Sequence, residues 1–178
     1  MTILRSIHMK SILAGLSLLL SASWAHAQGY SDSISVNFFL LDECIITINM
    51  TPEINRIYAD FRDDFQFTGY FPNRSTTPEN RQKFVEKYKL ELPVKSDYFK
   101  KQSQRLGATV APQVVVYDEK QERILYSGRI NNLYEAVGNR RKKPSIHDLE
   151  QALQSINDNQ AIINSKTQAV GCLINFKE

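Results

Sequence analysis

The spacing of hydrophobic residues changes several times along the chain, and each change predicts an element of secondary structure. Residues 34–41 (ISVNFFLL) alternate in polarity and then become continuously apolar, which is typical of a strand in the middle of a sheet. After Pro52, apolar residues recur at the spacing of one helix face. They are Ile54, Ile57, Tyr58 and Phe61. The first part of the chain therefore predicts a strand followed by a helix.

Strands and helices alternate through the rest of the chain. The expected elements are, in order, a strand at 65–71, a helix opened by Thr77 and Pro78, a short helix at 99–106, strands at 109–118 and 124–130, and a final helix. Ser145 and Asp148 resemble a capping box at the start of that final helix. This alternation predicts an α/β domain.

The N-terminal segment, residues 1–27, has the features of a secretory signal peptide. Arg5 and Lys10 precede an apolar run (ILAGLSLLL), and a small-x-small cleavage site (AHA) ends at Ala27. The apolar run is too short to cross a bilayer, which takes about 20 residues. We therefore expect cleavage near Ala27 and a periplasmic or secreted protein without stable membrane insertion.

The charge of the chain argues against nucleic acid as a partner. Removing Arg5 and Lys10 with the signal lowers the number of Lys and Arg from 22 to 20 against 19 Asp and Glu, a net charge of +1. A nucleic-acid-binding domain carries a larger positive excess. The one basic run, residues 140–143 (RRKK), lies between a glycine and a proline and is expected to be a solvated loop.

Two cysteines, Cys44 and Cys172, are the only ones in the chain. An exported protein meets an oxidising compartment, in which an even number of cysteines makes a pair plausible. Their chemistry depends on the structure around Cys44.

The stretch LDECIITINMTP around Cys44 resembles an altered active-site turn of the thioredoxin superfamily. In that family a cysteine after the first core strand begins a helix that a proline kinks eight residues later, and Cys44 and Pro52 have this separation. A second landmark of the family is a cis-proline that opens the next-to-last strand and faces the cysteine. Pro112 stands at that place, after Ala111. The resemblance implies that Ala111 and Pro112 contact the substrate.

Exported redoxins related to alkyl hydroperoxide reductases and to periplasmic thiol-disulfide oxidoreductases are the branch that the chain resembles. The resemblance implies an α/β, thioredoxin-like fold with a central mixed β-sheet flanked by helices. It also implies a redoxin-type strand-helix insertion at about residues 71–106. We expect the domain to cover residues 28–156, followed by a C-terminal tail at 157–178.

Opposing effects act on Cys44, which the resemblance implies is the nucleophile. The unpaired N–H groups of a helix N-terminus favour a thiolate by about 0.3 to 1 kcal/mol. Asp42 and Glu43 oppose it by about 0.7 kcal/mol each at roughly 6 Å in a water-like dielectric. The sequence leaves open whether Cys44 is an activated thiolate.

Thr47 is a departure from the family pattern, because it stands where the second cysteine of a Cys-x-x-Cys would be. A threonine cannot resolve a mixed disulfide, although its hydroxyl can donate a hydrogen bond to a thiolate or to the helix end. Cys172 is then the candidate resolving cysteine. The chain from Ile156 to Cys172 spans at most roughly 50 to 55 Å, which is enough to return to Cys44.

Three interpretations of the cysteine pair remain open. In the favoured one, Cys44 attacks and Cys172 resolves, which gives thiol-disulfide exchange with periplasmic protein thiols or small thiols and needs no cofactor. In the second, a permanent disulfide staples the tail and stabilises the fold by about 5 kcal/mol. In the third, the two thiolates bind Cu(I) in a metallochaperone-like role.

Other departures weaken the enzyme hypothesis. Peroxiredoxins have a threonine three residues before their cysteine and a proline further back, where this chain has LLDE, so peroxidase activity is not expected. The tryptophan that precedes the cysteine in thioredoxins is missing, since Trp24 falls in the signal segment, and Phe38 replaces their buried acid. The alternative is a noncatalytic thioredoxin-fold binding module.

Overall fold

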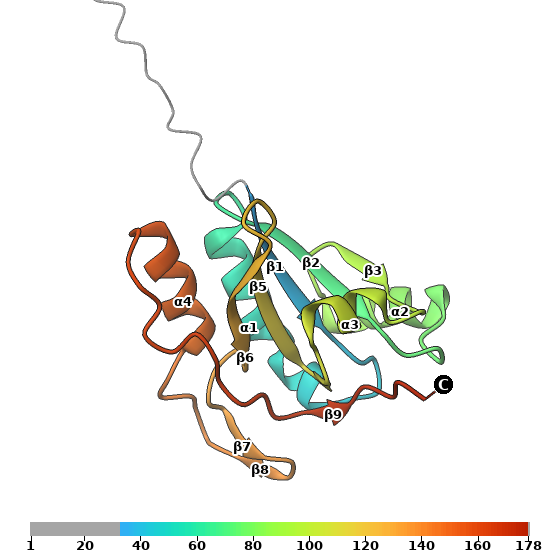
Figure 1. Cartoon of the computed structure of the whole chain (residues 1–178). Helices are drawn as coiled ribbons and strands as arrows, with labels where there is room; N and C mark the ends of the chain where they lie inside the picture. The colour runs from blue at the N-terminus through green and yellow to red at the C-terminus, as the bar shows by residue number, and fades with distance from the viewer. Residues whose placement is uncertain (1–32, 178) are drawn as a thin grey trace, which may run out of the picture.

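A five-stranded sheet forms the centre of the computed structural model, which describes residues 33–177 (Figure 1). Its strands, in the spatial order β3-β2-β1-β5-β6, are β3 (Val94–Ser96), β2 (Gln66–Phe71), β1 (Ile34–Phe39), β5 (Gln113–Asp118) and β6 (Arg123–Gly128). The strands β1, β2 and β3 are parallel, whereas β5 is antiparallel to both β1 and β6. Every residue of β1 is buried, because β1 has a strand on each side and a core on each face.

The helices divide unequally between the two faces of this sheet. They are α1 (Ile45–Phe61), α2 (Pro78–Tyr88), α3 (Lys101–Leu106) and α4 (Asp148–Asn157). Apolar side chains of α1, α2 and α4 join the larger core, which includes Val36 and Phe38. On the opposite face, Leu106 of α3 and Ile174 of the tail pack against Phe39. Successive side chains of β1 point to opposite faces of the sheet, so the strand contributes residues to both cores.

The predicted element order is confirmed, including the extra strand and helix, β3 and α3, between α2 and Pro112. Helix α1 already begins at Ile45 and continues through Pro52. Thr77 caps α2, since its side chain accepts a hydrogen bond from Asn80 N at 3.2 Å.

The capping box proposed for the last helix is wrong. Helix α4 begins after His147, which makes no side-chain cap hydrogen bond. Ser145 instead accepts a hydrogen bond from the side chain of Asn132 at 2.9 Å. Asp148 is buried in an ion pair with Arg129, with Nε and Oδ2 2.8 Å apart. Ser145 and Asp148 have the residue types of a capping box, but both side chains have tertiary partners.

Three short strands have no counterpart in the prediction, and the strand predicted at 109–118 is divided at Pro112 into β4 and β5. The pair β7 (Tyr134–Ala136) and β8 (Asn139–Arg140) forms a hairpin, so the basic run that was expected in a loop begins in a strand. The pair β4 (Val110–Ala111) and β9 (Cys172–Leu173) joins the tail to the segment before Pro112. In Figure 1, β7, β8 and β9 lie at the same end of the molecule, and β4 is there too because it pairs with β9.

The proposed signal segment, residues 1–27, lies outside the described residues. Within residues 33–177, the helices are too short or too polar to cross a bilayer.

Candidate redox site

Cys44 occupies the N-cap position of α1, where the chain leaves β1 and turns into the helix. Its backbone is extended, with φ −84° and ψ 116°, and its carbonyl oxygen accepts the first helical hydrogen bond from Ile48 N at 3.0 Å. The side chain is only 3% exposed. The local sequence therefore puts the sulfur at the positive end of a helix, as the resemblance implied.

The second cysteine is brought to this sulfur by the tail. Strand β9 runs antiparallel to β4, and Cys172 lies directly opposite Ala111. The side chain of Cys172 reaches hydrogen-bonding distance of the Cys44 sulfur. Both cysteines are free thiols here, Cys44 buried and Cys172 half-buried. The structure thus brings together the two cysteines that the sequence nominated.

Two protonation states of the pair use different hydrogen bonds. As a thiol, Cys44 Sγ donates to the carbonyl oxygen of Ala111 at 3.3 Å. Burial raises the pKa of Cys44, but hydrogen bonds from the Cys172 side chain and from backbone N–H groups of Thr47, Cys172 and Ile46 outweigh burial, and the net pKa is lowered. These hydrogen bonds stabilise the thiolate form of Cys44 relative to that of an ordinary cysteine.

Cys172 behaves in the opposite way. Burial, its hydrogen bond to Cys44 and the charge of Cys44 raise the pKa of Cys172 to about 11. Two thiolates at hydrogen-bonding distance would repel each other, so the second proton of the pair is lost only at a higher pH than the first. Cys44 is the cysteine that ionises first.

Thr47 contributes to the site through its backbone. The residue is 1% exposed, and its Oγ1 accepts a hydrogen bond from Leu41 N at 3.4 Å. This bond ties the turn before Cys44 to the first turn of α1, while the Thr47 N–H lowers the pKa of Cys44. The Thr47 hydroxyl thus accepts a hydrogen bond from the turn, and a bond that it donates to a thiolate stays a prediction.

Ala111 and Pro112 face the cysteines from the segment before β5. Both are buried, and the peptide bond between them is cis. Gln113 shapes this segment: its Oε1 accepts from Thr109 N at 3.0 Å, and its Nε2 donates to Ser127 Oγ at 3.2 Å. Gln113 was missed in the sequence, where no local pattern marks a side chain that folds back on its own loop.

The C-terminal end of the tail is held by a buried side chain and a glycine. Ile174 is 5% exposed and packs with Phe39 and Leu106, and its N–H donates to Thr109 O at 2.9 Å. At Gly171 a Cβ would overlap the carbonyl oxygen of Ala111, so only glycine allows this approach. Both residues were missed in the sequence, because a lone isoleucine and a lone glycine carry no pattern.

The tail is fastened a second time beside β6. Thr167 N donates to Ser127 O at 3.0 Å, and Thr167 Oγ1 accepts from Arg129 N at 3.1 Å and lies 2.7 Å from Tyr126 Oη. Burial raises the pKa of Tyr126 to about 12, so this hydroxyl stays protonated. With both attachments, the register of Cys172 on β4 is fixed from each side.

Solved structures share the fold of this chain at low sequence identity. A hypothetical protein from Sinorhizobium meliloti matches with a TM-score of 0.70 and 16% identity, over 82% of this chain and 80% of that chain. An uncharacterized conserved protein from Geobacillus kaustophilus matches with a TM-score of 0.69 and 19% identity, over 82% and 78%. A secreted Mycobacterium tuberculosis disulfide oxidoreductase homologous to E. coli DsbE matches with a TM-score of 0.51 and 17% identity, over 69% and 81%. This chain has the thioredoxin fold.

Sequence comparison adds no match to this result: neither a protein-family model nor a curated protein matches the chain. The thioredoxin fold is shown here by structure, together with the helix N-terminal cysteine and the facing cis-proline.

Among residues 33–177, two groups of side chains bring potential metal-ligand atoms close together. Cys44 and Cys172 offer two sulfurs, which suits Cu(I), and this remains a prediction. Glu53, His147 and Glu150 also lie within 4.8 Å of one another. Arg56 already binds both carboxylates of that group, 3.0 Å from Glu53 and 2.7 Å from Glu150. The second group is therefore an ion-pair network around Arg56.

Proposed function

We propose that the protein catalyses thiol-disulfide exchange through Cys44 and Cys172. The observation that carries the proposal is the pairing of Cys172 with Ala111, which brings the second sulfur to the N-terminus of α1. A dithiol with one stabilised thiolate is the arrangement that exchanges disulfides. The missing second cysteine at position 47 is thus replaced by a cysteine from the tail.

The solvent exposure of the two cysteines decides which sulfur the partner thiolate attacks. Cys44 is 3% exposed and lies beneath the tail, whereas Cys172 is half-buried on a two-residue strand. In the oxidised pair, an incoming thiolate therefore attacks Sγ of Cys172, forms a mixed disulfide there, and breaks the bond to Sγ of Cys44. The electron pair stays on Cys44, the thiol with the lowered pKa, which is the better leaving group.

A second thiolate of the partner completes the reaction. It attacks the partner sulfur of the mixed disulfide, so that Cys172 leaves and takes a proton from solvent. The partner loses two electrons and becomes a disulfide, and the cysteine pair gains them and becomes one thiolate and one thiol. These roles reverse the initial expectation that Cys44 attacks and Cys172 resolves.

The proposed location of the protein is the periplasm or the extracellular space. The N-terminal signal features, the even cysteine count and the secreted structural neighbour with the same fold support a periplasmic or secreted location. The partners there are protein thiols or small thiols.

Glutathione tests the proposal. The mature protein is equilibrated with mixtures of reduced and oxidised glutathione, and intact mass follows the loss of two hydrogens. We expect a reversible Cys44–Cys172 disulfide with a potential above about −300 mV. Acid quenching of the oxidised protein after brief exposure to glutathione, followed by peptide mapping, should find glutathione on Cys172. Absence of the disulfide at every ratio would contradict the function, and glutathione on Cys44 would contradict the order of attack.

A structural staple is the second candidate function. The burial of Cys44 and the independent fastening of the tail at Thr167 and Ile174 favour it. A staple would give a potential below about −300 mV. The same titration therefore separates the two candidates.

A further inference from the structure

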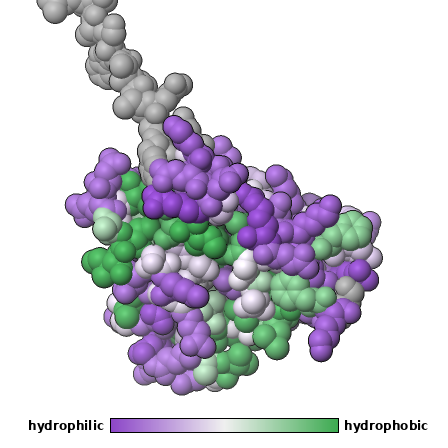
Figure 2. Space-filling model, viewed as in Figure 1, coloured by the Kyte–Doolittle hydropathy of each residue, from purple (hydrophilic) through white to green (hydrophobic). Residues whose placement is uncertain are grey.

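Exposed apolar side chains flank both sulfurs. Ile45, directly after Cys44, is 61% exposed, and Leu173, directly after Cys172, is 78% exposed. Val137, at the tip of the β7–β8 hairpin, is 71% exposed. Figure 2 shows apolar surface at the lower end of the molecule, where Figure 1 places β9 and this hairpin. Single exposed apolar residues are ordinary, but two of these adjoin a reactive pair.

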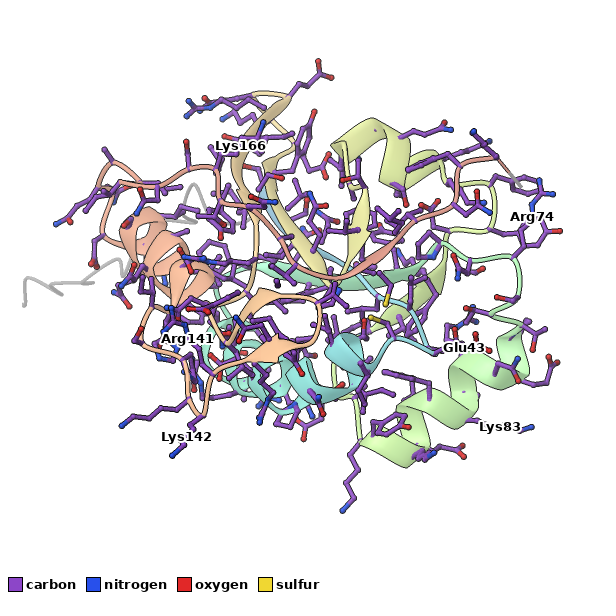
Figure 3. All side chains as sticks on the ribbon, turned by 90° about the horizontal axis from the view of Figure 1, so that it is seen from below. Glu43, Arg74, Lys83, Arg141, Lys142 and Lys166 are labelled. Carbon is purple, nitrogen blue, oxygen red and sulfur yellow. The ribbon has the colours of Figure 1, made fainter. Side chains whose placement is uncertain are left out.

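A cationic hairpin stands beside this apolar centre. The run Arg140, Arg141, Lys142 and Lys143 is exposed, and Glu135 pairs with Arg141 alone. Among residues 33–177, the other three cations make no ion pair. Figure 3, seen from the end that carries the hairpin, shows Lys142 projecting away from the protein. The hairpin thus offers unpaired positive charge.

The base of the hairpin fixes this charge near the cysteines. Tyr134 is buried, and its hydroxyl accepts a hydrogen bond from Asn49 Nδ2 at 2.6 Å, on the second turn of α1. Tyr134, Ile46 and Pro112 line one small cavity. The hairpin is therefore attached to the same helix end that holds Cys44.

We propose that the partner in exchange is a protein that presents its cysteine on an acidic surface with an apolar contact at its centre. The proposal rests on the function proposed above. An apolar centre with a charged rim is the usual anatomy of a protein interface, and complementary rim charges raise the association rate. Asp42 and Glu43 lie on the other side of Cys44, near Lys83. The acidic groups of the partner therefore lie on the hairpin side of its cysteine, away from Asp42 and Glu43, and the partner is a protein because exchange requires a cysteine.

Two dithiol peptides provide the test, identical except that one carries glutamate and the other lysine around its cysteines. With the oxidised mature protein at low ionic strength, we expect exchange with the acidic peptide to be at least about tenfold faster, and the difference to shrink as salt is added. The double variant Lys142→Ser/Lys143→Ser should slow the acidic peptide about threefold or more and leave glutathione exchange unchanged. The control Arg62→Ser/Lys120→Ser removes the same charge at the opposite end of the sheet and should change neither rate.

Several outcomes would overturn the proposal. One is an equal exchange rate for the two peptides, and another is an equal loss of the rate with the acidic peptide in the two double variants. A third is binding of the protein to anionic lipid vesicles that depends on Lys142 and Lys143. Loss of glutathione exchange itself would instead contradict the proposed function. In that case docking is tested in the absence of disulfide exchange. The acidic peptide is made with serine in place of cysteine, and the amide chemical shifts of the hairpin are followed as it is added. Shifts confined to the hairpin and β9 would support the proposal, and their absence would overturn it.

Discussion

Cys172 lies opposite Ala111 in the antiparallel pair of β4 and β9, and this pairing delivers the second sulfur to Cys44. In a Cys-x-x-Cys the two sulfurs lie in one helix turn, whereas here they come from Cys44 and Cys172, which are distant in sequence and close in space. The redox site therefore depends on the attachment of the tail.

Replacing Cys172 by alanine should raise the pKa of Cys44. Burial continues to raise that pKa, while the hydrogen bond from the Cys172 side chain, which lowers it, is lost. The measurement is the pH midpoint of Cys44 alkylation in the reduced protein. An unchanged or lower midpoint would show that the Cys172 side chain does not stabilise the thiolate.

Stability of the reduced protein should depend on pH in a way that this variant removes. Because the pKa of Cys172 is raised on folding to about 11, its contribution to stability is complete below the pKa of the unfolded thiol. It is lost as the pH rises through about 11. Urea unfolding in this alkaline range should therefore show a steeper loss of stability in the native protein than in Cys172→Ala. Parallel curves would contradict the raised pKa.

Replacing Ile174 by alanine should loosen the tail. Truncation of a buried isoleucine costs about 2 to 5 kcal/mol, and here the cost falls on the segment that covers Cys44. Alkylation of Cys44 should become at least about tenfold faster at fixed pH. Gln168→Ala, an exposed tail position, is the control and should leave the rate unchanged. Equal rates in all three proteins would show that the tail does not shield Cys44.

Replacing Gln113 by leucine should disturb the edge on which β9 forms. The N–H groups of Thr109 and Val110 lose their shared acceptor, and Thr109 O is the acceptor for Ile174 N. Hydrogen exchange at Ile174 should accelerate, while that of β1 stays slow. Gln104→Leu on the exposed face of α3 should have no such effect. Unaltered protection at Ile174 would show that the Gln113 side chain does not hold the edge on which β9 forms.

Replacing Asp148 by asparagine should destabilise the fold by about 3 kcal/mol. The Asp148 side chain is 3% exposed, and its loss leaves the charge of Arg129 without its partner. Asp60→Asn is the control, because Asp60 is 50% exposed and its pair with Arg56 is worth at most about 1 kcal/mol. Urea denaturation measures both. Similar losses would show that the Arg129 pair is screened by solvent.

Local patterns were sufficient for much of the fold. The alternation in β1, the Cys44-to-Pro52 spacing and the Thr77-Pro78 cap each depend on neighbouring residues, and the structure has a strand, a proline-containing helix and a capped helix at these places. The capping box at Ser145 failed because both of its residues have partners distant in sequence. Residue type at the right spacing does not exclude a stronger tertiary partner.

The sequence by itself determined the strand before Cys44 and the helix after Pro52, because these depend on local periodicity, and the resemblance to the thioredoxin superfamily added the helix start at Cys44 and the facing Pro112. Only the tertiary structure decided that the tail packs back against the domain and that Cys172 pairs with Ala111. Strand β9 has two residues, too few for any periodicity. It exists because β4 offers backbone partners, because Gly171 allows close approach and because Ile174 has a buried place beside Phe39.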